Sequence, residues 1–115
     1  MTSKKIAADN NVSVEGHACP VEMTMRIIGK RWTAIIIRDL VRGKKRFGEL
    51  EHSLGISAKV LSQRLVELEN CGILTREVFP EVPVRVEYSL TEKGHDLKRI
   101  IDSMSAWGSK WGDAD

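Results

Sequence analysis

Apolar side chains recur at intervals of three and four residues over much of the chain, which is the spacing of helices that bury one face. The first such stretch begins at Pro20, whose missing N–H would have no partner at the first helical position. Cys19 is therefore the expected N-cap of a helix over 20–28. A second, mostly buried helix is predicted over 32–41.

A pair of helices is predicted in the middle of the chain. The first is expected over 47–54, with Gly48 able to cap it. The second follows Ser57, a strong N-cap residue, and stops before Gly72. Its buried stripe is predicted to be Leu61, Leu65 and Leu68. The opposite face, free of carboxylates near its start, consists of Lys59, Ser62, Gln63 and Val66, with Arg64 at its margin.

Beyond this pair the apolar period changes to two, which predicts strands. Strands over 74–79 and 84–90 are expected to form a hairpin. The connecting loop, 80–83, contains two prolines, which discourage edge pairing with other chains. Thr91 can then cap a last helix. The apolar positions of that helix are Leu97, Ile100, Ile101, Met104, Trp107 and Trp111.

This order of elements predicts an α+β fold, mainly α: a winged helix-turn-helix with a two-stranded wing hairpin and terminal dimerisation helices. One domain is expected over 17–115, preceded by a flexible tail over 1–16. A domain of this size has little core left to cover two tryptophans near its end, so a second copy is the expected partner. The predicted dimer interface is Ile27, Ile100, Met104, Trp107 and Trp111.

The net charge of +2 conceals an uneven distribution of charge along the chain. Residues 26–64 carry ten Lys or Arg against three Asp or Glu, whereas residues 65–115 carry six against ten. A basic block of this kind is typical of nucleic-acid binding, because phosphates attract Lys and Arg whatever the base sequence. A solvated helix face would explain the charge alone equally well.

Several other classes of protein lack support in the sequence. No apolar run approaches the roughly 20 residues that span a bilayer, and no leader opens the chain, so a cytoplasmic protein without a membrane partner is expected. Cys19 and Cys71 are too few for a disulfide framework or a paired zinc motif. No glycine-rich phosphate loop, catalytic carboxylate pair or nucleophile elbow indicates an enzyme, and no cofactor is expected.

Short segments along the chain follow a known pattern. They are Cys19–Val21, Ile28–Thr33, Arg46–Leu50, Gly55–Ser57, Leu61–Leu65, Leu68–Glu69, Gly72–Leu74 and Pro80–Gly94. With its Cys-Pro opening, Gly-Lys-Arg-Trp-Thr block and Pro-Glu-Val-Pro wing, the chain resembles the HxlR-type transcriptional regulators from about residue 19 to 111. Departures at Gly48 and Leu54 affect the 47–54 helix more than the DNA face.

The resemblance implies a homodimeric bacterial regulator that binds double-stranded DNA at an inverted-repeat operator. In a helix-turn-helix, the second helix contacts base edges in the major groove while neighbouring elements hold phosphates. Its predicted DNA contacts are Ser57, Lys59, Ser62, Gln63 and Arg64, the last of which could equally brace the domain. Further positioning contacts are expected from Lys30, Arg31, Lys44 and Lys45, and from Arg85 in the minor groove.

Cys19 is also predicted to be a redox sensor. Unpaired N–H groups and the dipole at a helix N-terminus favour the reactive thiolate. Some HxlR-type proteins use a cysteine at this place, so a small oxidant or electrophile is the expected effector, with a half-buried structural cap as the alternative. Cys71, at the opposite end of a helix, is expected to be structural and packed behind Gly72.

Two other functions remain open. The first is a metal- or ligand-responsive regulator, which His17 and Cys19 suggest because both are possible metal ligands. A metal needs three or four ligands, however, and His52 and His95 lie on other elements. The other alternative is a winged-helix module that binds only protein. The absence of carboxylates from the predicted DNA face argues against it.

Overall fold

The computed structural model describes residues 19–112, so the expected tail and His17 lie outside the described part. By its internal contacts the chain divides into two units, one ending at Lys30 and the other beginning at Arg31. Over residues 19–112, no helix combines the length and the apolar character needed to cross a membrane.

The first unit contributes one described helix, α1 (Pro20–Ile28). The predicted cap is confirmed, since Cys19 Sγ accepts a hydrogen bond from the Glu22 N–H at 3.3 Å. Glu22 also lies within the first turn and pairs with Arg26 at 3.6 Å across one turn of the helix. These contacts define the start of α1 and the position of the Cys19 sulfur on it.

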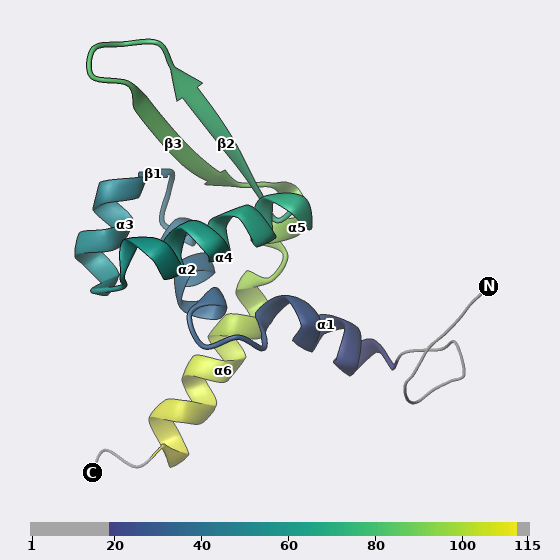
Figure 1. The fold of residues 1–115 in the computed structure, drawn as a ribbon. Helices are drawn as coiled ribbons and strands as arrows, with labels where there is room; N and C mark the ends of the chain where they lie inside the picture. Colours follow the sequence, from purple (N-terminus) through teal and green to yellow (C-terminus); the bar gives the residue numbers. More distant parts are fainter. Residues whose placement is uncertain (1–18, 113–115) are drawn as a thin grey trace, which may run out of the picture. The chain divides into compact units, whose positions relative to one another are not determined.

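The second unit is a winged helix-turn-helix (Figure 1). Its elements are α2 (Thr33–Val41), β1 (Lys45–Arg46), α3 (Phe47–Leu54), α4 (Ala58–Asn70), β2 (Leu74–Phe79), β3 (Arg85–Leu90), α5 (Glu92–His95) and α6 (Lys98–Trp111). The strands form an antiparallel sheet in the order β1-β3-β2. The long hairpin of β2 and β3 extends beyond the helices as the wing, which confirms the predicted fold class.

The sheet has one more strand than predicted. β1 pairs with the middle strand through Lys45 opposite Tyr88 and Arg46 opposite Glu87. Two residues are too few to show an alternating pattern in the sequence, which is why the strand was not predicted. It ties the basic run before α3 to the base of the wing.

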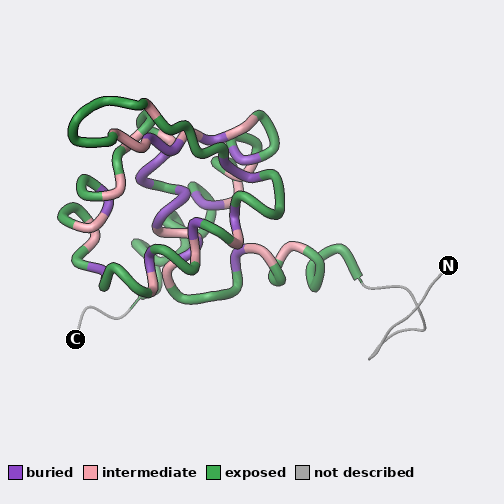
Figure 2. Tube along the Cα trace, turned by 45° about the horizontal axis from the view of Figure 1, so that its top comes forward, coloured by how far each residue is buried: buried purple, intermediate pink, exposed green. Residues whose placement is uncertain are grey.

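The core of this unit lies between the helices and the base of the sheet. Figure 2 shows buried segments gathered in its interior and an exposed wing tip. The core residues are Ile36, Ile37, Leu40, Leu50, Ile56, Leu61, Leu65, Leu68, Ile73, Leu74, Tyr88, Leu90 and Ile101. The predicted stripe of α4 is therefore confirmed, and it fixes which side of that helix faces outward.

Helix α3 begins two residues earlier than a Gly48 cap would require. Its N-cap is Arg46, whose backbone N–H donates to Glu49 Oε1 at 2.8 Å. The prediction of Gly48 as the cap was wrong, because β1 leads directly into the helix and Glu49 satisfies its first donor. α3 ends at Gly55, whose φ of 65° is a left-handed conformation that favours glycine.

Helix α4 has the boundaries that its sequence predicts. Ser57 Oγ accepts a hydrogen bond from the Val60 N–H at 3.2 Å. At the other end Gly72 has a φ of 74°, and the Ile73 N–H donates to Leu68 O at 2.9 Å. This is the Schellman arrangement, in which a left-handed glycine satisfies the last helical carbonyls.

The end of α4 is joined to the start of α5 by a set of hydrogen bonds that we call the clasp, formed by residues 71–73 with Thr91 and Lys93. Thr91 Oγ1 donates to Gly72 O at 2.6 Å, and Lys93 Nζ donates to Cys71 O at 2.7 Å. The Thr91 N–H donates to Ile73 O at 2.9 Å. The clasp fixes α4 relative to the base of the wing.

The C-terminal helix is interrupted, whereas a continuous helix was predicted after Thr91. Thr91 does act as a cap, accepting the Gly94 N–H at 3.1 Å, but α5 is only four residues long. α6 then begins at Lys98 after Leu97. Gly94 packs closely against the clasp, and glycine is a poor helix former. The chain therefore changes direction after α5, and α6 then packs against α2.

Candidate nucleic-acid interface

The outward face of α4 is exposed, and its polar side chains lack partners in the described part of the chain. Lys59, Ser62 and Gln63 are exposed, and in residues 19–112 none of their side chains makes a hydrogen bond or ion pair. Val66 on the same face is also exposed. The first turn of α4 contains no acidic residue. This face therefore presents free donors and acceptors of the kinds that contact base edges.

Two flanking positions of α4 have other contacts. The Ser57 hydroxyl oxygen accepts the cap hydrogen bond and keeps its proton available as a donor. Arg64 lies closer to the core, with only 20% of its side chain exposed, and Nη1 donates to the Glu67 carboxylate at 3.2 Å. These contacts favour the bracing role of Arg64 over a contact with phosphate.

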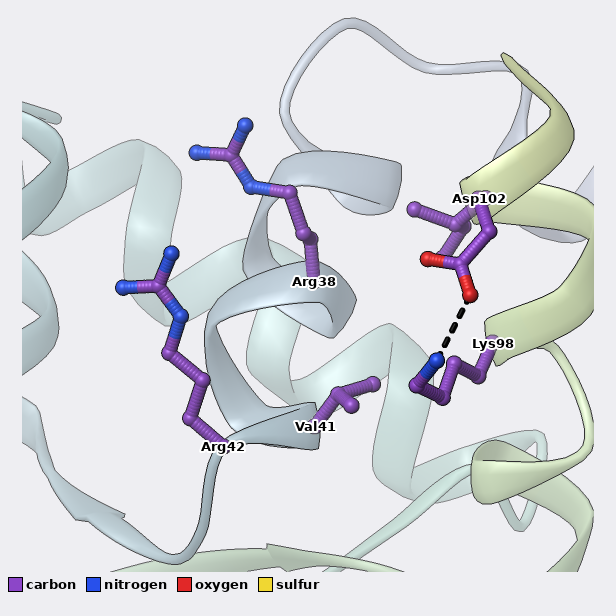
Figure 3. A pocket seen from close by; sticks show the side chains of 6 residues that line it. Arg38, Val41, Arg42, Lys98 and Asp102 are labelled. Carbon is purple, nitrogen blue, oxygen red and sulfur yellow. Dashed lines mark hydrogen bonds and ion pairs between the residues drawn. The ribbon is translucent and has the colours of Figure 1, made fainter. Parts of the chain in front are cut away.

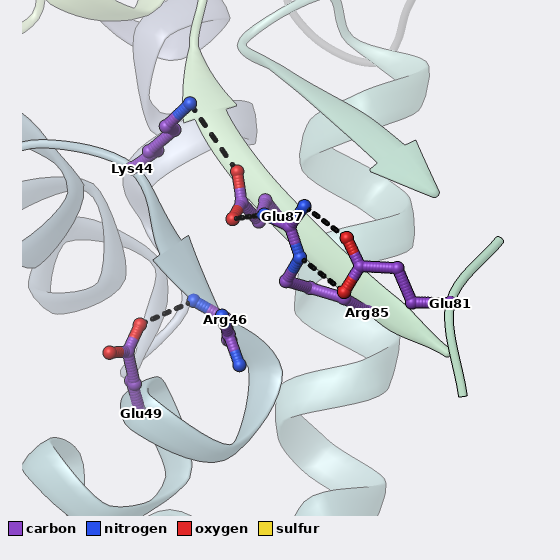
Figure 4. A network of polar contacts seen from close by, with 6 residues as sticks. All are labelled: Lys44, Arg46, Glu49, Glu81, Arg85 and Glu87. Carbon is purple, nitrogen blue, oxygen red and sulfur yellow. Dashed lines mark hydrogen bonds and ion pairs between the residues drawn. The ribbon is translucent and has the colours of Figure 1, made fainter. Parts of the chain in front are cut away.

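The wing carries a network of four charged side chains on the side of β1 and the wing loop, Lys44, Glu81, Arg85 and Glu87 (Figure 4). Lys44 Nζ lies 3.4 Å from Glu87 Oε1. Arg85 donates from Nη1 to Glu87 Oε2, and its Nε and Nη2 donate to the Glu81 carboxylate at 3.2 and 2.6 Å. We call this set the wing network.

The wing network keeps its members charged. The hydrogen bond from Arg85 holds the pKa of Glu81 below its usual value. Burial acts to raise the pKa of Glu87, but hydrogen bonds from Arg85 and Lys44 outweigh it and the net shift is downward. The hydrogen bond to Glu81 raises the pKa of Arg85. Arg85 is thus present in the free protein as a paired cation, with its Cζ 3.8 Å from the centre of the Phe79 ring.

The remaining predicted phosphate contacts lie on separate elements. Lys45 and Arg46 form β1, and Arg31 lies over the Trp32 ring at 5.5 Å. Lys30 belongs to the first unit and is exposed. Arg46 was missed as a site residue, although it completes the basic run that the sequence displays; its charge also lowers the pKa of Glu81.

A cavity of about 300 Å³ lies between α2 and α6 (Figure 3). It is lined by Arg38, Val41, Arg42, Lys98, Ile101 and Asp102. Lys98 Nζ pairs with Asp102 Oδ2 at 2.6 Å on the α6 side. On the α2 side, the exposed side chains of Arg38 and Arg42 form no ion pair within the described range. The cavity is open and basic, and no predicted site residue lines it.

Both cysteines are exposed. The expectation that Cys71 packs behind Gly72 was wrong, because Cys71 is the C-cap of α4 and its side chain stays at the surface. Within residues 19–112, no three His, Cys, Asp or Glu side chains are grouped closely enough to hold a metal ion. His17, the other half of the suggested metal pair, lies outside the described residues.

Helix α6 exposes a row of large apolar side chains. Met104, Trp107 and Trp111 are 48%, 66% and 65% exposed, and Ile100 on the same face is half-buried. Ile27, the other predicted interface residue, is half-buried and belongs to the first unit.

The sequence profile of the HxlR-like helix-turn-helix family matches residues 27–115. The chain belongs to this family. It is 46% identical over 99 residues to YvaP of Bacillus subtilis, described as an uncharacterized HTH-type transcriptional regulator, covering 84% of this chain and 92% of YvaP.

Solved structures support the same assignment. The redox regulator HypR in its oxidized form has a TM-score of 0.78 and 43% identity, over 84% of this chain and all of HypR (100%). Quinone-bound YodB of B. subtilis has a TM-score of 0.70 and 40% identity, over 82% of this chain and 100% of YodB. The protein is therefore a DNA-binding transcriptional regulator.

Proposed function

We propose that this protein binds an inverted-repeat operator as a homodimer and that modification of Cys19 controls its affinity for DNA. The observation that carries the proposal is the outward face of α4, where Lys59, Ser62 and Gln63 are exposed and unpaired among the described residues. In a helix-turn-helix this helix enters the major groove. Its free side chains would then meet base edges.

The base contacts follow from the chemistry of the three side chains. Gln63 can make two hydrogen bonds to adenine N6 and N7, and Lys59 can donate to guanine O6 and N7. Ser62 can donate or accept. Ser57 is better suited to a phosphate, because its oxygen already accepts the cap hydrogen bond. Base recognition is thus assigned chiefly to Gln63 and Lys59.

Phosphate contacts come from basic residues outside this helix. We assign them to Lys30, Arg31, Lys44 and Lys45, with the addition of Arg46. Arg64 is assigned to bracing α4 through Glu67. Such contacts fix the position of the protein on the duplex without selecting its sequence.

The dimer is supported by the exposed row on α6. Large aromatic side chains exposed side by side are unusual on the surface of a monomer and are typical of interfaces. A two-fold dimer places two recognition helices in symmetric positions, which matches an operator with inverted-repeat symmetry. Each protomer then binds one half-site.

Control by Cys19 is supported by its place at the start of α1. The exposed sulfur accepts an N–H of the first turn, where the helix dipole stabilises negative charge. Two relatives point to the same chemistry, since HypR is described as a redox regulator and YodB has been solved with bound quinone. Oxidation or alkylation of Cys19 would alter the grip of the dimer on DNA.

The test is selection of genomic fragments by the purified protein, followed by gel shifts with the selected operator and a scrambled duplex at two salt concentrations. Gln63→Ala is expected to lower discrimination between the two duplexes by about 5- to 100-fold, because one pair of base contacts is lost. Lys44→Ala is the comparison variant and should weaken binding to both duplexes and flatten the salt dependence. Equal loss on both duplexes for Gln63→Ala would contradict base recognition by this residue.

A further inference from the structure

Arg85, the first residue of β3 after the wing loop, already has carboxylate partners in the free protein. Arg85 gives Nε and Nη2 to the two oxygens of Glu81 at 3.2 and 2.6 Å. Two parallel N–H···O bonds from one guanidinium are also the geometry in which arginine binds two phosphate oxygens. Glu81 therefore covers the edge of Arg85 that a DNA phosphate would use (Figure 4).

The two carboxylates that pair with Arg85 differ in how far they are buried. Glu87 belongs to the middle strand, and only 10% of its side chain is exposed, whereas Glu81 lies in the wing loop with 52% exposed. The Phe79 ring supports the guanidinium from one side. Glu87 and Phe79 would hold Arg85 in place without Glu81. Of the two carboxylates, only Glu81 can separate from Arg85 at a small cost in free energy, because exposed ion pairs contribute little to stability.

We propose that Glu81 is a built-in competitor of DNA: on binding, a backbone phosphate replaces the Glu81 carboxylate on Nε and Nη2 of Arg85. Glu87 and Phe79 keep the guanidinium oriented during the exchange. The inference rests on the proposed DNA-binding function and assigns Arg85 a phosphate contact. The wing network, two cations and two anions, is neutral in the free protein, and the departure of Glu81 leaves it positive where it faces DNA.

The test is fluorescence anisotropy of a labelled duplex of mixed sequence, since a phosphate contact does not depend on base sequence. Glu81→Gln removes the competitor and is expected to tighten binding about two- to fivefold. Glu77→Gln is the matched control: Glu77 is exposed on β2 of the same hairpin and makes no ion pair within residues 19–112. It loses the same charge and should change affinity much less.

Repeating the Glu81→Gln substitution in an Arg85→Lys variant distinguishes the exchange of Glu81 for phosphate from simple repulsion of DNA by a carboxylate. Arg85→Lys keeps the positive charge but loses the fork of parallel donors. In that background Glu81→Gln should give little further gain. Thermal unfolding of every variant checks that it is folded.

Three results would overturn the exchange. They are no gain from Glu81→Gln, an equal gain from Glu77→Gln, or an undiminished gain in the Arg85→Lys background. Wild-type protein that binds no duplex would overturn the proposed function together with the exchange. Wild-type protein that binds normally while any of the three results is seen would overturn the exchange alone.

Discussion

Cys19 and Cys71 are both exposed, and they differ in where they lie on their helices. Cys19 is an N-cap whose sulfur accepts the Glu22 N–H. Cys71 is a C-cap, and its carbonyl oxygen accepts Lys93 Nζ. A helix dipole favours an anionic sulfur at the first position and disfavours it at the second. Exposure alone would not distinguish the two thiols, whereas their reactivity should.

Iodoacetamide should therefore alkylate Cys19 several-fold faster than Cys71, since the thiolate is the nucleophile. The rates can be measured by mass spectrometry on Cys19→Ser and Cys71→Ser, each of which retains one cysteine. Diamide should change the DNA affinity of Cys71→Ser and leave that of Cys19→Ser unaltered. Equal alkylation rates, or a response that survives in Cys19→Ser, would remove the basis for sensing by Cys19.

Two glycines show how differently the helical elements depend on their surroundings. A Cβ at Gly94 in α5 would lie 2.2 Å from Ile73 O and 3.0 Å from Leu90 Cδ2, both near the clasp. A Cβ at Gly48 in α3 would meet nothing within 4 Å. The first glycine is required by close packing of backbone, and the second is not.

Gly94→Ala should accordingly lower the free energy of unfolding by about 1–3 kcal/mol, because the backbone of the clasp must shift. Gly48→Ala should raise it by about 0.5–1 kcal/mol, since glycine is a poorer helix former than alanine. Urea unfolding followed by circular dichroism measures both. A Gly94→Ala variant as stable as wild type would show that the clasp tolerates displacement.

The elements that the sequence predicted well are those whose signals are local. Ser57 and Gly72 lie at the two ends of α4, so its boundaries could be found from neighbouring residues alone. The cap of α3 could not, because it depends on β1, which exists only through pairing with β3. The interruption before α6 likewise depends on the packing of Gly94 against Ile73, far away in sequence.

At the scale of the whole molecule, the same distinction separates the two parts of the candidate site. The outward face of α4 follows from the apolar period of one helix, and the structure confirms its exposure. The wing network draws its members from the turn before β1, the wing loop and β3. These ion pairs could not be predicted from the spacing of residues along the chain. The sequence therefore identified Arg85 as a cation but not Glu81 and Glu87 as its partners.

The exposed row on α6 gives a prediction for the whole assembly. Trp107 and Trp111 lie on one face of α6 with Ile100 and Met104, whereas Ser109 lies on the opposite face. Trp107→Glu should weaken the dimer about 30-fold or more, as expected for loss of a central aromatic contact. Ser109→Glu, which adds the same charge, should leave the dimer intact.

Analytical ultracentrifugation over a range of concentrations measures the dimer directly. Binding to DNA gives an independent measurement, since the monomer retains its recognition helix. Trp107→Glu should therefore keep its affinity for a single half-site and lose the tighter binding to a full inverted repeat, where two linked helices act together. If Trp107→Glu sediments as the wild type does, the dimer must form through another surface, and the tryptophans of α6 would need a different partner.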